Sequence, residues 1–236
     1  AIAELLISKG HTVIGTGRRQ EKLDELQTQL GDKFIPLNFD VSDLPATKTA
    51  LQTLPSHVLN NLDVLVNNAG LALGLEPADK TDFADWQQMV NTNILGLIHL
   101  THEILPFMVA NNDGYIINLS STAGNYPYFG GNVYGATKAF VTQFSLNLRA
   151  DLVGKNIRVS NIEPGLCGGT EFSNIRFHGD DAKAAQVYDS VQYVTPQDIA
   201  NMVAWLIEQP KHVNINRIEV MPTAQTFAGL KVVKDL

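Results

Sequence analysis

Apolar residues along this 236-residue chain occur in two patterns that alternate. Short runs rich in Val, Ile and Leu are typical of strands, and longer stretches with an apolar residue every three or four positions are typical of amphipathic helices. Their regular alternation predicts a parallel sheet with helices on its faces. The expected strands are 11–16, 34–39, 62–66, 115–119, 157–162 and 217–220, and the expected helices are 1–9, 21–30, 43–54, 82–110, 133–153 and 196–208.

Two local features refine this prediction. Ser42 precedes the helix expected over 43–54 and is a favourable N-cap residue. The long helix over 82–110 contains a stretch near 93–96 where we expect a bend. No repeat, linker or change of composition divides the chain, so we expect a single domain over residues 1–236.

The order of these elements predicts an α/β fold with a doubly wound, mostly parallel sheet. Such a sheet begins with a central strand, whereas this sequence begins inside a helix. Without that strand its two neighbours would face a gap about two strand spacings wide, roughly 9–10 Å. We therefore expect that about 10–15 residues, a strand and a Gly-rich loop, are absent from the sequence. The alternative is a variant of the fold that starts at this helix.

Charge and composition exclude several classes of function. The chain has 17 basic and 24 acidic residues, a net charge of −7, which disfavours binding to nucleic acid or anionic lipid. We find no run of about 18 apolar residues and therefore expect no membrane span. The single cysteine excludes a disulfide framework. His99 and His102 beside Glu103 lack a third ligand, so we expect no metal site. The acidic charge and the lack of an expected membrane span favour a cytoplasmic protein.

The strongest chemical signal is the motif Tyr134-x-x-x-Lys138, which places a phenol and an ammonium on one face of a helix. Ser121 lies 13 residues before the tyrosine, at the end of the strand expected over 115–119. About 0.01 occurrences of this three-residue pattern are expected by chance in a chain of this composition. The strand would bring Ser121 to the carboxyl edge of the sheet, where α/β proteins bind their ligands.

Two further segments follow expected strands in the same way. The sequence Asn67-Asn68-Ala69-Gly70 comes directly after strand 62–66, and Glu163-Pro164-Gly165 comes after strand 157–162. Asn93 lies at the expected helix bend. Together these motifs resemble the short-chain dehydrogenase/reductase superfamily, and longer stretches resemble its NADP-dependent 3-hydroxy acid dehydrogenases. The chain departs from that family in lacking the N-terminal T-G-x-x-x-G-x-G loop.

The resemblance implies a Rossmann fold, NADP as cofactor and a homotetramer. It also implies oxidation of short 3-hydroxy acids, such as L-serine, allo-threonine and 3-hydroxypropionate, or the reverse reduction of malonic semialdehyde. Two alternatives remain open: a reductase of another small carbonyl compound, and a non-catalytic NADP-binding protein. The apolar tail over 221–230 either packs on its own domain or contacts another subunit.

The same resemblance assigns roles to four residues. Tyr134 would exchange a proton with the substrate hydroxyl, and Ser121 would hydrogen-bond the substrate oxygen. A Lys138 ammonium about 4 Å away could lower a phenol pKa of about 10 by about three units, and it could also bind the nicotinamide ribose. Asn93 would anchor the helix bend and a water that returns the proton.

Cofactor preference follows partly from the residues themselves. Arg18 and Arg19 come after the strand at 11–16, where an NAD enzyme usually carries an acidic residue, and two guanidiniums suit a 2′-phosphate. Arg176 could clamp the carboxylate of a hydroxy acid or be an ordinary surface charge. The resemblance adds these cofactor contacts: Asp40, Val41, Asn68, Ala69, Gly70, Tyr134, Lys138, Pro164, Gly165, Leu166, Cys167 and Thr170.

Overall fold

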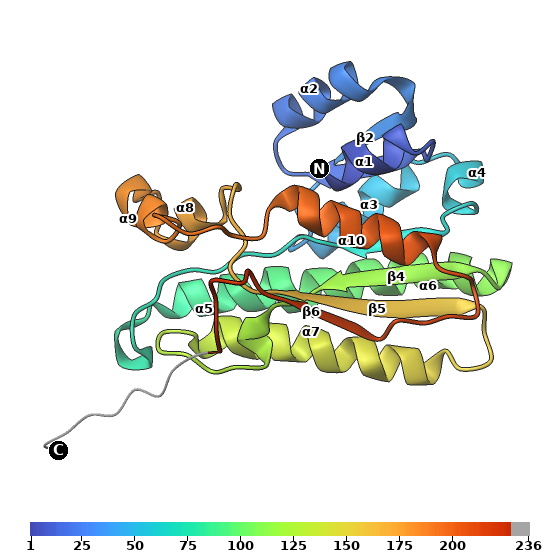
Figure 1. The fold of residues 1–236 in the computed structure, drawn as a ribbon. Coiled ribbons are helices and arrows are strands. Elements are labelled where there is room, and N and C mark those ends of the chain that lie inside the picture. The colour runs from blue at the N-terminus through green and yellow to red at the C-terminus, as the bar shows by residue number, and fades with distance from the viewer. Residues whose placement is uncertain (228–236) are drawn as a thin grey trace, which may run out of the picture.

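The computed structural model describes residues 1–227, so residues 228–230 of the apolar tail lie outside it. All strands in this part of the chain are parallel to their neighbours, as the sequence predicted (Figure 1). β1 (Val13–Gly17) pairs with β2 (Phe34–Asn38). A second sheet has the order β3 (Val64–Asn67), β4 (Gly114–Leu119), β5 (Ile157–Pro164) and β6 (Arg217–Val220).

The two sheets are separate. Within residues 1–227, β1 pairs only with β2 and β3 pairs only with β4, so no strand joins β1 to β3. A gap between two strands of the sheet was expected from the sequence, and it lies between β1 and β3. The helices and the core nevertheless hold the two sheets in one α/β arrangement (Figure 1).

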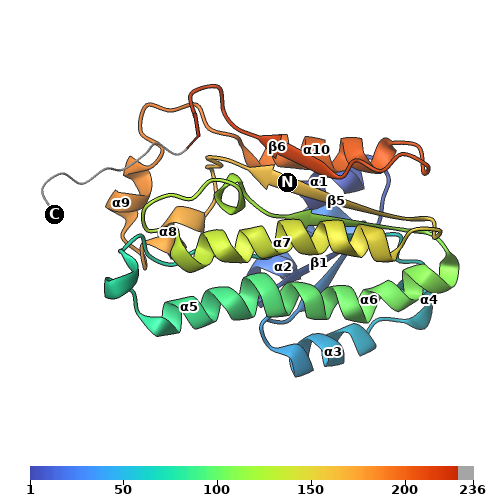
Figure 2. The same cartoon turned by 90° about the horizontal axis from the view of Figure 1, so that it is seen from below.

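Helices cover both faces of the sheets (Figure 2). One apolar cluster contains side chains of α3, α6 and α7 with β2, β3, β4 and β5, and a second contains side chains of α1 and α10 with β4 and β5. The helices are α1 (Ile2–Ser8), α2 (Gln20–Leu30), α3 (Leu44–Gln52), α4 (Ser56–Leu59), α5 (Phe83–Val90), α6 (Leu97–Asn111), α7 (Asn132–Asp151), α8 (Phe172–Arg176), α9 (Asp181–Gln186) and α10 (Pro196–Glu208).

The central strand β4 shows why the sheet needs both layers. Ile116 packs in the cluster with α6 and α7, and Tyr115 and Ile117 pack in the cluster with α1 and α10. Every residue of β4 is buried. A strand covered on both sides is continuously apolar, which is why its sequence does not alternate with polar residues.

The expected bend in the long helix is a π-helical segment, η3 (Asn91–Gly96), between α5 and α6. A wider turn of this kind displaces the backbone and is frequent at functional sites. Gly96 ends it, and a Cβ atom at this position would lie 2.8 Å from the Val41 carbonyl oxygen. Glycine therefore allows the bend to approach the loop that follows β2.

The segment Phe83–Asn111 is long and apolar enough to cross a membrane by length and composition alone. The core helix of a globular domain meets the same criterion. Here Ile104 and Met108 of α6 are buried in the core cluster against the sheet, and 33% of the apolar window is buried inside the fold.

Several local predictions were wrong. Asp43, and not Ser42, caps α3, because its carboxylate accepts the Ala46 N–H at 2.9 Å. Ser42 instead donates its hydroxyl to Asp40 at 2.7 Å. The short helices α4, α8 and α9 were not expected, since four to six residues are too few to show a helical period.

Candidate active site

The chemistry-bearing residues meet at the carboxyl ends of β4 and β5, as the motif spacing predicted. Ser121 follows β4, Pro164 ends β5, and Asn93 lies in η3. Tyr134 and Lys138 occupy the first two turns of α7, which packs against this edge of the sheet (Figure 2). The parallel direction of the strands places these segments together, because all their carboxyl ends face the same edge.

Asn93 fixes the geometry of this edge. Its buried amide oxygen accepts the Leu71 N–H at 2.9 Å, and its amide nitrogen donates to the Leu71 carbonyl at 2.8 Å and to the Thr137 hydroxyl at 3.0 Å. One side chain thus joins the loop after β3, the π-helical bend and α7. Asn93 is 1% exposed, so it has little access to bulk water in this structure.

Lys138 is buried beneath the loop after β3. Its ammonium donates to the Leu119 carbonyl at 2.9 Å, and burial lowers its pKa from 10.5 to about 8. A Cβ atom at Gly70 would lie 3.2 Å from Nζ, so the small residue is needed for this close approach. An ammonium has three N–H donors, and the two beyond the Leu119 contact suit a pair of ribose hydroxyls.

Tyr134 differs from the expectation in its acidity. Burial is the largest effect and raises its pKa from 10 to about 12. The Arg176 charge and a hydrogen bond with Ser121 lower the pKa and only partly offset burial. Lys138, whose ammonium lies 5.9 Å from the ring centre, is not among the groups that shift this pKa, so the expected lowering by Lys138 is not seen in this structure. The phenol stays protonated at neutral pH, which suits a proton donor.

Ser121 is held in place by its own backbone surroundings. Its hydroxyl accepts the Ala123 N–H at 3.1 Å and contacts the Pro164 carbonyl at 3.2 Å. The Ser121 side chain also lowers the pKa of the neighbouring Tyr134 phenol. Ser121 thus lies between the phenol and the end of β5, where it can reach an oxygen atom bound next to Tyr134.

Arg176 comes from α8 and lies over the candidate catalytic tyrosine. Its guanidinium carbon is 5.0 Å from the Tyr134 ring centre and 5.1 Å from that of Phe172. One Nη donates to the Tyr128 hydroxyl at 3.2 Å. Its Nε is buried without a hydrogen-bond partner. A buried donor without an acceptor is costly, and an anionic or polar ligand would supply the acceptor that this nitrogen lacks.

The predicted cofactor contacts form two groups. Asn68, Ala69 and Gly70 are exposed on the loop after β3. The second group, within residues 164–170, lies in the segment after β5. There Gln225 accepts the Leu166 N–H at 2.6 Å, and the Cys167 carbonyl accepts the Tyr188 hydroxyl at 3.2 Å. Burial raises the pKa of the Cys167 thiol, which keeps it protonated, so its small size explains its place better than reactivity.

The expected 2′-phosphate residues carry carboxylate partners that the sequence did not reveal. Arg18 lies 3.5 Å from Asp40, whose pKa is lowered by Ser42 and Arg18 despite some burial. Arg19 makes a two-pronged contact with Glu171 at 3.1 and 2.6 Å. No acidic residue adjoins the arginines in sequence, but the fold brings one to each of them.

A row of buried asparagines was also missed. Asn67, Asn118 and Asn161 lie in register on β3, β4 and β5. Asn67 donates to Asn118 at 2.8 Å, and Asn118 donates to Ser145 of α7 at 2.8 Å. The row links α7 to the sheet just below the candidate site. Each asparagine lies near the end of its strand pattern, and this shared position is the signal that could have identified the row.

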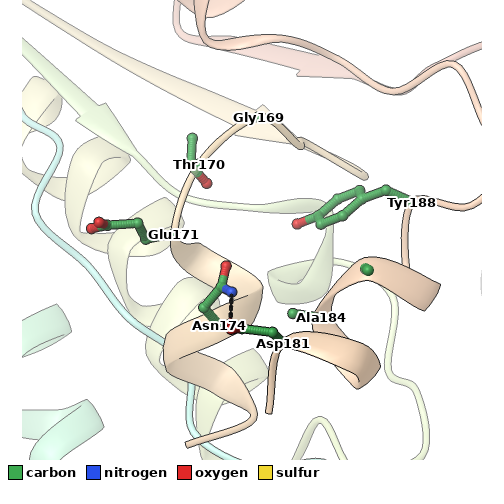
Figure 3. A pocket seen from close by; sticks show the side chains of 8 residues that line it. Gly169, Thr170, Glu171, Asn174, Asp181, Ala184 and Tyr188 are labelled. Carbon is green, nitrogen blue, oxygen red and sulfur yellow. Dashed lines mark hydrogen bonds between the residues drawn. The ribbon is translucent and has the colours of Figure 1, made fainter. Parts of the chain in front are cut away.

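A hollow of about 460 Å³ lies on the segment after β5 (Figure 3). All of its lining residues come from positions 169–188, and Asn174 donates to Asp181 across it at 2.6 Å. Neither Tyr134 nor Ser121 lines it, whereas Thr170, one of the expected cofactor contacts, does. Among residues 1–227, no cluster of three or more His, Cys, Asp or Glu side chains could hold a metal ion.

Comparisons with known proteins agree with this geometry. A family model described as short chain dehydrogenase matches residues 1–180. A probable NADP-dependent dehydrogenase of Haemophilus influenzae is 66% identical over 235 residues, which cover all of this chain and 93% of the relative. Serine 3-dehydrogenase of Rhizobium radiobacter is 50% identical over 235 residues with the same coverage. A solved closed form of serine dehydrogenase complexed with NADP+ superposes with a TM-score of 0.97 at 54% identity, covering 99% of this chain and 94% of that one.

The burial of Lys138 predicts a change in stability with pH. Below pH 8 the folded state holds a buried charge, and between pH 8 and 10.5 it binds fewer protons than the unfolded chain, so stability rises with pH in that window. Lys138→Met should therefore raise the free energy of unfolding at pH 7 by about 1–3 kcal/mol, after the cost of leaving the Leu119 carbonyl unpaired.

Urea unfolding at pH 7, 9 and 10.5 measures this difference. The advantage of Lys138→Met should shrink towards pH 10.5, and the exposed Lys48→Met should change stability by less than about 0.5 kcal/mol. A Lys138→Met protein that is less stable than the parent at pH 7 would show that the buried ammonium is not destabilising.

Proposed function

Because the chain belongs to the short-chain dehydrogenase family, we propose that it is an NADP-dependent oxidoreductase of short 3-hydroxy acids. In one direction it would oxidise acids such as L-serine, allo-threonine or 3-hydroxypropionate, and in the other it would reduce malonic semialdehyde. The observation that carries the substrate class is Arg176, whose buried Nε lacks a partner beside Tyr134.

The distance between the cation and the phenol favours a short substrate. In a 3-hydroxy acid, three covalent bonds separate the carboxyl carbon from the hydroxyl oxygen. Arg176 lies 5.0 Å from the Tyr134 ring centre, so a carboxylate on the guanidinium places the hydroxyl close to the phenol. A guanidinium can bind a carboxylate through two parallel hydrogen bonds, which would also orient the substrate.

The protein's own residues divide the proton chemistry among them. NADP, when bound, supplies or accepts the hydride. In the reductive direction the protonated Tyr134 donates its proton to the carbonyl oxygen, and Ser121 donates a hydrogen bond to the charge that develops there. Lys138 would bind ribose hydroxyls. Asn93 holds the Leu71 backbone and α7 at the distance that this arrangement requires.

Cofactor choice is supported by the cations after β1. Arg18 and Arg19 would bind the 2′-phosphate that distinguishes NADP from NAD, and Asp40 and Val41 would contact the adenine. The names of the Haemophilus and structural relatives, which specify NADP, support the same assignment. Gly70, Gly165 and Thr170 would face the remainder of the dinucleotide.

Initial rates of NADP+ reduction with L-serine and with 3-hydroxypropionate test this function. We expect turnover with NADP+, little with NAD+, and a loss of about 10²–10⁴-fold in kcat for Tyr134→Phe with cofactor binding retained. Binding of NADPH without turnover of any acid would favour a reductase of another carbonyl compound or a protein that only binds the cofactor.

The role of Arg176 has its own test. Arg176→Ala should raise KM for 3-hydroxypropionate by about 10–100-fold, since one charge-assisted contact is lost, with a smaller effect on kcat. A primary alcohol without a carboxylate serves as the control substrate, and its kcat/KM should change much less. An unchanged KM for the acid would refute the carboxylate clamp.

We also propose that the protein is a cytoplasmic homotetramer. Phe140 is 36% exposed on α7 and stacks on Phe144, with ring centres 5.9 Å apart, and Trp205 is 47% exposed on α10. These helices lie on opposite layers (Figure 2), so two separate patches support two kinds of interface, as a tetramer with D2 symmetry requires.

The single cysteine and the acidic charge support the cytoplasmic location, which cell fractionation tests.

Sedimentation velocity measures the assembly. We expect a tetramer, and we expect Phe140→Arg to yield dimers because a buried unpaired charge disrupts one interface and leaves the other intact. A parent protein that sediments as a monomer at micromolar concentration would contradict the proposal.

A further inference from the structure

Arg19 and Glu171 form the longest-range ion pair beside the candidate site. Arg19 immediately precedes α2, and Glu171 immediately precedes α8 in the segment that carries Arg176. The guanidinium meets both carboxylate oxygens, at 3.1 and 2.6 Å, and Lys22 approaches the same carboxylate at 3.7 Å. Two cations thus converge on one anion, and Arg19 is 152 residues from it in sequence.

The carboxylate meets these cations at the border of the neighbouring hollow, of which Glu171 is a lining residue. Figure 3 shows the Glu171 side chain pointing away from the Asn174–Asp181 hydrogen bond on the other side of its loop. Arg19, Lys22 and Glu171 are each about half exposed, so water and dissolved anions can reach the pair. A carboxylate and a phosphate offer a guanidinium the same two-oxygen geometry.

We infer that Glu171 is a specificity residue. Its carboxylate accepts the Arg19 hydrogen bonds that the 2′-phosphate of the cofactor would otherwise accept. This inference rests on the proposed role of Arg19 as a phosphate ligand. A dinucleotide with a 2′-phosphate must displace the carboxylate from Arg19, or share the guanidinium with it. A dinucleotide with a 2′-hydroxyl leaves the ion pair intact. Glu171 therefore weakens the binding of NADP and leaves that of NAD unchanged.

The same contact explains how a site with several cations avoids simple anions. An unpaired Arg19 beside Arg18 and Lys22 would attract any phosphate in solution. With Glu171 in place, a ligand must make enough other contacts to displace the carboxylate. The dinucleotide can do this through the adenine and ribose contacts, whereas inorganic phosphate cannot.

Binding of NADP+ and NAD+ to Glu171→Gln, measured by isothermal titration calorimetry, tests the inference without depending on turnover. The variant should bind NADP+ about 3–10-fold more tightly than the parent and NAD+ within about twofold of it, since one exposed ion pair and one repulsive charge are removed. The gain should shrink at about 1 M salt, where charges are screened beyond about 3 Å.

Glu208→Gln is the matched control. Glu208 pairs with Lys9 at 2.7 Å at a similar exposure on α10, away from the candidate site, and its substitution should leave both affinities unchanged. Inorganic phosphate should compete with NADP+ more strongly in Glu171→Gln than in the parent.

Each remaining outcome is informative. An equal change for NADP+ and NAD+, no change, or weaker NADP+ binding would overturn the inference, as would a failure of either protein to bind NADP+. A selective gain in NADP+ affinity without turnover of any hydroxy acid would support the role of Glu171 and overturn only the proposed substrate.

Discussion

The amide of Asn93 is the contact on which the arrangement of the site depends. Its oxygen and nitrogen satisfy both backbone groups of Leu71, and the nitrogen also meets Thr137 one turn from Tyr134. An aspartate could not donate these bonds, and an aliphatic residue would leave two buried backbone groups unpaired. The π-helical turn exists where this side chain must reach two neighbouring segments. The position of α7 relative to the sheet edge follows from it.

Burial sets the electrostatics of the same site, and it acts in opposite directions on two neighbouring groups. It favours the neutral forms, so the pKa of Tyr134 rises and that of Lys138 falls. The tyrosine therefore stays protonated at neutral pH, and the pKa of the lysine, about 8, lies close to neutral pH. Arg176 opposes this trend for the phenol because it brings a positive charge from a different element, α8.

The sequence predicted the parallel strands, the long helices and the position of Ser121 at the carboxyl edge of the sheet, because each rests on a local pattern or on the rule that parallel strands end at one edge. It predicted the bend at Asn93 but not its π-helical form. The partners of Arg19 and Lys138 could not be predicted from local patterns. Glu171 is 152 residues from Arg19, and such a contact is fixed by tertiary packing. The sign of the Tyr134 shift was missed for the same reason, since spacing indicates a nearby cation but not the depth of burial.

The segment after β5 connects the two positions at which we propose that anions bind. Glu171, which faces the cations near β1, and Arg176, which faces Tyr134, lie at opposite ends of one short helix. A carboxylate released from Arg19 by a phosphate would change the restraint on the helix that carries the proposed substrate clamp. The backbone of Arg176 is itself tied to the loop after β3 through the Gly74 N–H at 2.8 Å. The segment is thus held at both ends. At its exposed end, a dissolved anion can displace the Glu171 carboxylate from Arg19. The proposed cofactor and substrate contacts are therefore carried by one short element, which is tied to the loop after β3 at its Arg176 end.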